Sequence, residues 1–514
     1  MNFRLALAVV AAAGFVALSY EITWFRVYGF LTGGTAGSFG VMLAAYLAGV
    51  ALGSVFARRA CKDDDGHRPE RLRLPALLTA VASILGFLLL PYIAWHVTVL
   101  HWTASLPAVA TIAGLSGAIL PLIAHFGVAA DHRAGERLSL LYLANIVGCT
   151  AGSLTTGFVL LDVMPLRHVS IVLTVIGLAL AWLLFAASRP RPRAVVAAAM
   201  AALALTAAAM AATPALYDRL WPRLQRKTHY DGKERFARVI ENRSGIIAVD
   251  NDHKVYGSGI YDGRFSTGLT PDSNIIYRAY AIAAVHQKPT RVLMIGLSTG
   301  AWANVLIHAP GVERLDTIEI NPGYLQLIAD EPLVAPLLRN PRSHIHIDDG
   351  RRWLRANPTA TFDVIVQNTT YHWRGHITNL LSGEYMALIR SHLNPNGVFM
   401  FNTTSSAAAQ KTACEVFDSG FRLSNFMFVS NAPALDLDLK AWRSALEGWK
   451  VNGVQTFDLS LAEHRAVIDE LISRRDKPIY FDTCAALLVK HRDETSITDD
   501  NMRSEFDEPW YRSH

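Results

Sequence analysis

The sequence predicts two folded parts in series: an α-helical transmembrane bundle of about seven spans, then an α/β domain of the Rossmann type. Residues 1–213 consist mainly of Ala, Leu, Val, Gly and Ile, which is the composition of membrane-spanning segments. From residue 291 onward, β-rich runs alternate with helix-like segments, which predicts a parallel sheet with helices on both faces. A chain of 514 residues is long enough for two or three domains.

Seven apolar stretches in the first part are close to the length that crosses a bilayer, which is about 20 residues for a helix. They lie near 5–28, 38–57, 74–95, 104–127, 138–161, 168–187 and 194–212. The first stretch is too long for a signal peptide and lacks a small-residue cleavage site, so we interpret it as an anchor. Small residues are frequent in 44–54 and 146–157 and let helices pack closely in lipid, which predicts a packed bundle.

A few polar residues lie inside these stretches, where they are costly and therefore candidates for function. Glu21 and Arg26, five positions apart, could pair with each other. His125 and Asn145 could instead form hydrogen bonds between helices or anchor the helix ends, which is the more ordinary interpretation.

Basic residues concentrate in alternate connections, which predicts the orientation of the bundle. These connections contain Arg58, Arg59, Lys62, Arg68, Arg71 and Arg73, then Arg133 and Arg137, then Arg189, Arg191 and Arg193. The pattern predicts a cytoplasmic N-terminus, and seven crossings would place the second part outside the cytoplasm. The basic run Arg219, Arg223, Arg226 and Lys227 argues against translocation, although long domains cross largely regardless of charge.

Two isolated cysteines bear on the same question. Cys414 and Cys484 could form a disulfide in an oxidising compartment, or they could be two buried thiols. No CxxC motif or metal-ligand spacing occurs, so we predict no metal site. The net charge of +5 is modest and gives no indication of a nucleic-acid partner.

The second part divides into three predicted regions. Residues 214–236 form a linker, 237–290 form a β-hairpin subdomain with a lead-in helix, and 291–514 form the Rossmann-like domain. The expected strands are 291–296, 315–320, 344–348, 362–368 and 397–404. A helix is expected over 381–397, ended by the Asn-Pro-Asn-Gly sequence.

Ligands of such sheets bind at the carboxyl ends of the strands, so the sequence itself nominates a pocket. The first turn contains Gly296, Ser298, Thr299 and Gly300; the second strand ends in Glu319; the third is followed by Asp348, Asp349 and Gly350. Glycines permit a tight turn, and a carboxylate after the second strand suits the two hydroxyls of a ribose. Together these features predict a nucleoside pocket.

These motifs resemble the spermidine synthase branch of the class I S-adenosylmethionine fold. The resemblance rests on "YGSGIYDGRFS" (256–266), "SNIIYRAY" (273–280), "IEI" (318–320), "DDG" (348–350) and "FDVIVQN" (362–368). The stretches 20–34, 43–54, 116–123 and 141–161 resemble the membrane domain fused to bacterial spermidine-synthase-like proteins. The resemblance implies S-adenosylmethionine or its decarboxylated form as donor, and a multi-pass protein of the bacterial inner membrane.

The departures from that family concern the polyamine end of the pocket. Where the family has an acidic first loop, this chain has Ser298 and Thr299, and a Tyr-His-Glu run is replaced by Tyr277-Arg278-Ala279. The catalytic Asp of the family corresponds to Asn368, whose amide cannot act as a general base. True aminopropyl transfer to putrescine is therefore in question.

A loop of unusual composition follows Asn368 and is the candidate replacement. It contains Tyr371, His372, Trp373, Arg374 and His376, of which His is the usual proton acceptor near neutral pH and Arg could hold an anion. We assign Asn368, Tyr371, His372, Arg374 and His376 to catalysis. Asp262, Tyr277 and Asn402 are assigned to substrate binding, and Gly296, Ser298, Thr299, Gly300, Glu319, Asp349 and Gly350 to the donor.

Three hypotheses for function follow. The first is a membrane-bound spermidine-synthase-like transferase acting on a small-molecule or lipid-linked acceptor. The second is a noncatalytic nucleoside-binding sensor on a membrane bundle, and the third is a transporter with a regulatory domain. The sequence leaves open whether chains form a homo-oligomer.

Overall fold

The computed structural model describes residues 3–61, 69–128, 131–369 and 371–506. The chain divides into two compact units, one up to Ala248 and one from Val249 onward. Lys62 and Arg68, two of the basic residues in the second connection, lie outside the described residues.

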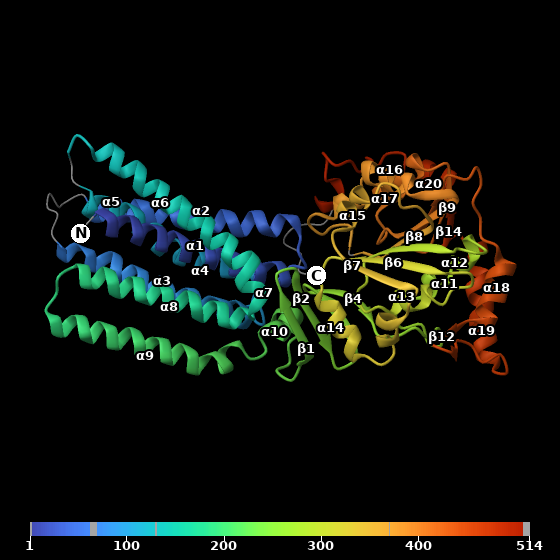
Figure 1. The fold of residues 1–514 in the computed structure, drawn as a ribbon, viewed down its shortest axis with the longest axis horizontal. Coiled ribbons are helices and arrows are strands. Elements are labelled where there is room, and N and C mark those ends of the chain that lie inside the picture. The colour runs from blue at the N-terminus through green and yellow to red at the C-terminus, as the bar shows by residue number, and fades with distance from the viewer. Residues whose placement is uncertain (1–2, 62–68, 129–130, 370, 507–514) are drawn as a thin grey trace. The chain divides into compact units, whose positions relative to one another are not determined.

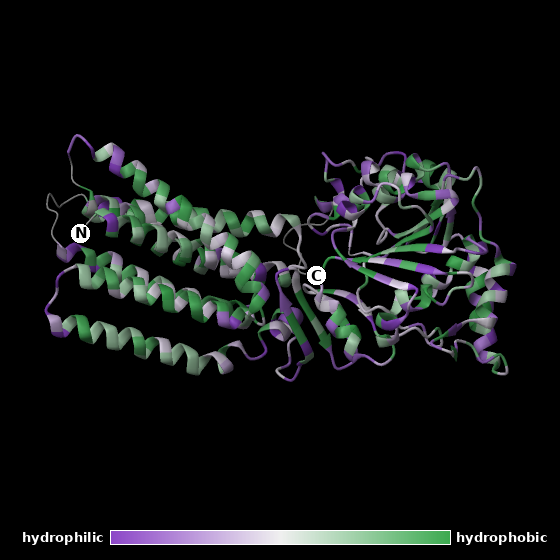
Figure 2. Ribbon diagram, viewed as in Figure 1, coloured by the Kyte–Doolittle hydropathy of each residue, from purple (hydrophilic) through white to green (hydrophobic). Residues whose placement is uncertain are grey.

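The first unit contains seven helical stretches long and apolar enough to cross a membrane, as predicted. They are Phe3–Leu31, Ala36–Cys61, Pro69–His96, Trp102–Phe126, Ala134–Val163, Leu166–Ala187 and Pro192–Tyr217. Within them the individual helices are α1 (Phe3–Leu31), α2 (Ala36–Cys61), α3 (Arg73–His96), α4 (Leu106–Gly117), α5 (Ile119–Gly127), α6 (Ala134–Thr155), α7 (Leu161–Val163), α8 (Leu166–Ala187) and α9 (Pro192–Tyr217). The helices run side by side and are apolar along most of their length (Figures 1 and 2).

Glycines allow these helices to approach at backbone distance. A Cβ atom added at Gly53 of α2 would lie 1.9 Å from the carbonyl oxygen of Gly114 in α4. One added at Gly148 of α6 would lie 1.9 Å from the carbonyl oxygen of Ala11 in α1. The small residues of 44–54 and 146–157 therefore do form helix contacts, as the sequence predicts.

The expected pairing of Glu21 with Arg26 is wrong. The Arg26 guanidinium instead donates from Nη2 to the carbonyl oxygens of Asn242 (2.5 Å) and Gly245 (2.8 Å). These belong to β1 (Phe236–Asn242) and β2 (Gly245–Asp250), which follow the short helix α10 (Leu220–Arg226). The reason is that backbone carbonyls at the end of the bundle offer a fixed acceptor pair within reach of α1.

Glu241 of β1 makes a second link to the same end of the bundle. Its carboxylate accepts from the backbone N–H of Leu166 (2.8 Å) and from Nε1 of Trp221 (3.1 Å). Leu166 begins α8, so the first strand after the bundle is held at the end where α1 finishes and α8 starts.

In the second unit, β3 (Lys254–Gly257) and β4 (Ile260–Arg264) pair as an antiparallel hairpin. Two short helices follow, α11 (Tyr277–Tyr280) and α12 (Ile282–Val285), and lead into the large sheet. Asn274 ties the hairpin to this lead-in segment, because its side chain accepts from the Arg264 N–H (3.1 Å) and donates to the Arg264 carbonyl (3.0 Å).

The large sheet has eight strands in the order β14-β10-β11-β9-β8-β5-β6-β7. The bounds are β5 Arg291–Ile295, β6 Arg314–Glu319, β7 Ser343–Ile347, β8 Phe362–Gln367, β9 Leu393–Asn402, β10 Ser419–Leu423, β11 Phe426–Ser430 and β14 Phe481–Thr483. The neighbouring strands β9, β8, β5, β6 and β7 are parallel, as predicted. Strands β11, β10 and β14 extend the sheet beyond β9, and each is antiparallel to its neighbour. The parallel strands therefore end at one edge.

The predicted helix over 381–397 is too long. Helix α16 covers only Gly383–Ser391, and the Asn-Pro-Asn-Gly sequence lies inside β9. Leu393 already pairs with Phe362, and the Asn394 side chain donates to Asp363 (2.8 Å). Contacts with the neighbouring strand β8 therefore place the Asn-Pro-Asn-Gly residues in the sheet, where the sequence predicted the end of a helix.

Helices cover both faces of this sheet (Figure 1). On one face α11, α12, α13 (Ala301–Leu306), α18 (Leu439–Gly448) and α19 (Ala462–Ser473) contribute to one buried apolar cluster. On the other, α15 (Gly350–Ala356), α16, α17 (Ala407–Val416) and α20 (Cys484–Lys490) contribute to a second. Cys414 and Cys484 form a disulfide that joins α17 to the start of α20.

Candidate active site

A cavity of about 230 Å³ opens at the carboxyl edge of the parallel strands. Its walls come from the β4 hairpin, the lead-in segment before β5, the loops after β5 and β8, the end of β9 and the turn before β11. The lining residues are Tyr261, Asp262, Gly263, Asn274, Ile275, Arg278, Met294, Gly296, Leu297, Ser298, Thr299, Trp302, Asn368, Thr369, Tyr371, Asn402, Thr404, Ser405 and Asn425.

The first loop follows β5 in a conformation that requires glycine. Gly296 has φ of 90°, and a Cβ there would lie 2.9 Å from the carbonyl oxygen of Asn368. Gly300 has φ of 74° just before α13. Between them, the Ser298 hydroxyl donates to the Asp262 carbonyl oxygen (2.5 Å), which fastens the hairpin to the loop.

Glu319 ends β6 and faces the same loop. Its carboxylate accepts from the backbone N–H groups of Leu297 (2.8 Å), Ser298 (3.3 Å) and Asn321 (2.8 Å). Burial raises the pKa of Glu319 to about 7, despite these donors, because the side chain is almost fully removed from water. Glu319 does not line the cavity itself, and lies behind the loop that does.

The residues after β7 also lie outside the cavity lining. Asp349 caps α15, accepting from the Arg352 N–H at 2.8 Å. Gly350 is needed for packing, because a Cβ there would lie 2.8 Å from a side-chain carbon of Ile295. Close by on the sheet edge, Ile320 and Ile347 follow β6 and end β7, and both side chains are exposed.

Asp262 is the one carboxylate among the residues that line the cavity. It accepts a hydrogen bond from the Tyr324 hydroxyl of α14 (Gly323–Asp330). Burial raises the pKa of Asp262, while Tyr324 and the positive charge of Arg374 oppose that shift. Arg374 thus acts on Asp262 and does not line the cavity.

Asn368 belongs to a chain of side-chain amides along the cavity wall. The Asn402 Nδ2 donates to Asn368 Oδ1 (3.3 Å), and the Asn425 Nδ2 donates to Asn402 Oδ1 (3.2 Å). The chain ends at Arg278, whose Nη1 donates to Asn425 Oδ1 (2.9 Å). Asn368 is therefore the first of three hydrogen-bonded amides, and the third of them accepts from the buried guanidinium of Arg278.

The loop after β8 is only partly in the cavity. Tyr371 lines it and stacks on Trp373, with ring centroids 5.4 Å apart. His372 does not line the cavity, and its Nδ1 atom lies 2.7 Å from Oγ1 of Thr404, which does. The backbone N–H of His376 donates to Glu505 (2.9 Å), so this part of the loop is held by the C-terminal segment.

The structure thus brings Asp262, Gly296, Ser298, Thr299, Asn368, Tyr371 and Asn402 together at one cavity. Tyr277, Gly300, Glu319, Asp349, Gly350, His372, Arg374 and His376 lie outside its lining; the Tyr277 hydroxyl donates to Ser424 at 2.6 Å. Sequence reasoning missed Arg278, Asn274 and Asn425 as lining residues. The sequence contained an indication for Arg278, since the resemblance aligns it with the central residue of the family's Tyr-His-Glu run.

Among the described residues, no cluster of three or more His, Cys, Asp and Glu side chains could hold a metal ion. The side chains in the cavity wall are mainly amides and hydroxyls, which suit hydrogen bonding to an organic ligand.

Comparison with known proteins fits this geometry. A family model described as the spermine/spermidine synthase domain matches residues 281–430, which run from α12 to the end of β11. The chain contains a spermine/spermidine synthase domain. It is similar to a polyamine aminopropyltransferase of Mycobacterium tuberculosis, 26% identical over 428 residues that cover 78% of this chain and 77% of the relative.

A second relative is polyamine aminopropyltransferase 2 of Streptomyces coelicolor, 27% identical over 406 residues, covering 76% of this chain and 71% of that protein. Among solved structures, the spermidine synthase of Thermotoga maritima is 19% identical, with a TM-score of 0.36, covering 46% of this chain and 88% of that one. Residues 281–430 are thus similar to a domain of the spermine/spermidine synthase family, and the chain is similar to proteins named polyamine aminopropyltransferases.

Proposed function

We propose that this protein transfers an aminopropyl or related group from an S-adenosylmethionine-type donor to an amine acceptor. The observation that carries the proposal is the cavity at the carboxyl edge of β5, β8 and β9, with Asp262 in its wall and the spermine/spermidine synthase domain around it. The relatives named polyamine aminopropyltransferases support the same reaction class.

The transfer is a displacement at carbon. The acceptor nitrogen attacks the propyl carbon bonded to the sulfonium, so a C–N bond forms and the C–S bond breaks. The electron pair goes to sulfur, which leaves as a neutral thioether nucleoside, and the acceptor nitrogen loses one proton. The protein has to hold the nitrogen in line and accept that proton.

We assign to Asp262 the role of binding the amine acceptor and taking its proton. Asn368 can accept a hydrogen bond from an amine but cannot take its proton. Asp262 lines the cavity as a carboxylate, and burial raises its pKa, which makes the carboxylate a stronger proton acceptor than an exposed one. The thioether nucleoside would lie toward the first loop and Glu319.

Release of 5′-methylthioadenosine from decarboxylated S-adenosylmethionine, in the presence of a panel of amines, tests the proposal by chromatography. We expect turnover by the wild type and a loss of about 100-fold or more in kcat for Asp262→Asn. Asp252→Asn is the matched control, because Asp252 is exposed in the turn between β2 and β3. Absence of turnover by the wild type with every donor and amine would refute the proposed transferase activity.

Asn368 and Thr299 favour one other function, a noncatalytic nucleoside-binding sensor, because both replace acidic groups of the family pattern. The two functions differ in one measurement. A sensor would bind 5′-methylthioadenosine in calorimetry and release none from any donor.

We also propose a multi-pass protein of the bacterial inner membrane, with its second unit outside the cytoplasm. Three observations support this: the seven apolar helices, the basic connections at the N-terminal end of the bundle, and the disulfide between Cys414 and Cys484. The acceptor would be a small molecule or a lipid-linked amine in that compartment.

A further inference from the structure

Arg278 is a buried charge in the cavity wall that the proposed transfer does not use. It lies on α11 and is 5% exposed. Its guanidinium carbon is 5.1 Å from the ring centroids of both Trp302 and Phe426, so two aromatic faces hold it in place. Burial lowers the pKa of Arg278 to about 10, which still leaves it charged at neutral pH.

The protein partners of this guanidinium are neutral. Nε donates to the Ile275 carbonyl oxygen (3.0 Å) and Nη1 to Asn425 Oδ1 (2.9 Å). No carboxylate among the described residues forms an ion pair with it. The negative charge of Asp272 acts on Arg278, but its carboxylate already accepts from the N–H groups of Asn274, Ile276 and Tyr277.

A buried cation without an ion-pair partner is costly, and the cost falls when an anion binds beside it. The other charged group of the cavity lining, Asp262, is held by the Tyr324 hydroxyl and has Arg374 as its nearby positive charge. The charge of Arg278 is therefore available to an anionic ligand in the cavity.

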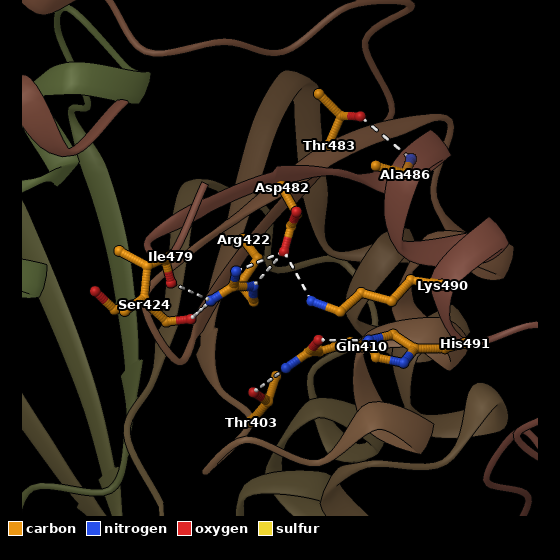
Figure 3. A network of polar contacts seen from close by, with 10 residues as sticks. All are labelled: Thr403, Gln410, Arg422, Ser424, Ile479, Asp482, Thr483, Ala486, Lys490 and His491. Atoms are coloured by element: carbon orange, nitrogen blue, oxygen red, sulfur yellow. Dashed lines mark hydrogen bonds and ion pairs between the residues drawn. The ribbon is translucent and has the colours of Figure 1, made fainter. Parts of the chain in front are cut away.

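The wall around Arg278 is fixed in position. The Asn425 carbonyl oxygen accepts from the N–H (3.0 Å) and the hydroxyl (2.9 Å) of Thr403, and the preceding Ser424 carbonyl accepts from Arg422 (2.5 Å). Figure 3 shows this support: Arg422 is paired with Asp482, and Gln410 bridges His491 to Thr403. The amide oxygen of Asn425 is thus directed to Arg278 and its nitrogen to Asn402.

A diammonium acceptor would meet like charge at this wall, whereas a carboxylate would find a planar, preoriented donor. We propose that Arg278 forms a carboxylate-binding subsite of the cavity, so that the ligand pair of this transferase includes a carboxylate. The proposal rests on the proposed function. The carboxylate has two possible sources: a donor that has not been decarboxylated, or an amino-acid acceptor.

Two ligand pairs that differ by one carboxylate test the subsite by calorimetry on the full-length protein in detergent. The donor pair is S-adenosylmethionine and its decarboxylated form. The acceptor pair is ornithine and putrescine, measured with 5′-methylthioadenosine present at saturation. We expect the carboxylate member of one pair to bind about 10- to 100-fold more tightly, as a charge-assisted hydrogen bond implies. The pair that discriminates identifies the source.

Arg278→Gln should reduce that ratio to less than about threefold and leave 5′-methylthioadenosine binding unchanged. Arg278→Lys should retain part of the preference, because the charge stays and the planar fork is lost. Arg291→Gln is the matched control: Arg291 also lies over an aromatic ring, 5.3 Å from the centroid of Phe362, but at the opposite end of β5.

Each outcome is decisive. Equal affinities within both pairs, or a preference for the decarboxylated members, overturn the subsite. The comparison within each pair needs only the wild type, so poor folding of Arg278→Gln would not prevent it. If 5′-methylthioadenosine itself fails to bind and no donor is turned over, the proposed function fails, independently of the subsite.

Discussion

Glu319 shows how a single side chain can couple the site to pH. It accepts three backbone N–H groups, yet desolvation dominates and raises its pKa from 4.5 to about 7. Because the folded-state pKa is raised, the folded protein binds the proton more tightly than the unfolded chain. The stabilising contribution is complete below about pH 4.5 and is lost as the pH rises through 7.

We expect the affinity for 5′-methylthioadenosine to rise between pH 6 and pH 8, because the ionised carboxylate is the better acceptor for the Leu297 and Ser298 N–H groups and so holds the loop that lines the cavity more firmly. Calorimetry in buffers of different ionisation enthalpy should detect a proton released on binding at pH 6.5. Glu319→Gln should bind more weakly, by about 10-fold, and without pH dependence. A pH profile in Glu319→Gln identical to that of the wild type would show that another group titrates.

At the scale of elements, the helix pairs of the first unit depend on positions that tolerate no side chain. Helix α2 offers a direct comparison, because two of its glycines, Gly53 and Gly40, have different surroundings. At Gly53 a Cβ would lie 1.9 Å from the Gly114 carbonyl oxygen, whereas at Gly40 no heavy atom lies within 4 Å.

Gly53→Ala should therefore force α2 and α4 apart and lower the free energy of unfolding by about 1–3 kcal/mol. Gly40→Ala is the matched control, with the same gain in helix propensity and no contact, and should be neutral or slightly stabilising. Thermal unfolding in detergent measures both. A melting temperature equal for the two variants would mean that α2 and α4 do not pack as closely as described.

For the whole molecule, the first unit has two different ends. The described basic residues of the connections lie at the end of the bundle where α1 begins, and β1 is held at the other end by Arg26 and Glu241. Seven long apolar helical stretches connect these two ends, so in the proposed orientation the ends lie on opposite sides of the membrane. The proposed location also raises a supply problem, because S-adenosylmethionine is made in the cytoplasm and would have to reach the other side.

Reporter fusions after residue 187 and after residue 236 test the proposed orientation. With seven crossings, green fluorescent protein should fluoresce only at the first fusion and alkaline phosphatase should be active only at the second. The thiols of Cys414 and Cys484 should resist alkylation in intact cells until a reductant is added. The same reporter signal at both positions would place the second unit in the cytoplasm.

The sequence by itself determined the seven apolar helices and the five parallel strands β5 to β9, whereas the antiparallel strands β10, β11 and β14 were not predicted from it. Apolar length predicts a helix long enough to cross a membrane, and strand–helix alternation predicts a parallel sheet, because both depend on local patterns of residues. It also indicated the strand ends at which Gly296, Asn368 and Asn402 meet. The extent of α16 was overestimated, since pairing of Leu393 with Phe362 is a contact between distant residues.

Only the tertiary structure decided which polar side chains share a cavity. Arg374 and Arg278 are both arginines near polar motifs, but one acts on Asp262 and the other faces the ligand space. Their roles depend on which partners surround each guanidinium after folding. Those partners lie on segments far apart in the chain, such as Asn425 for Arg278, so no local pattern can specify them.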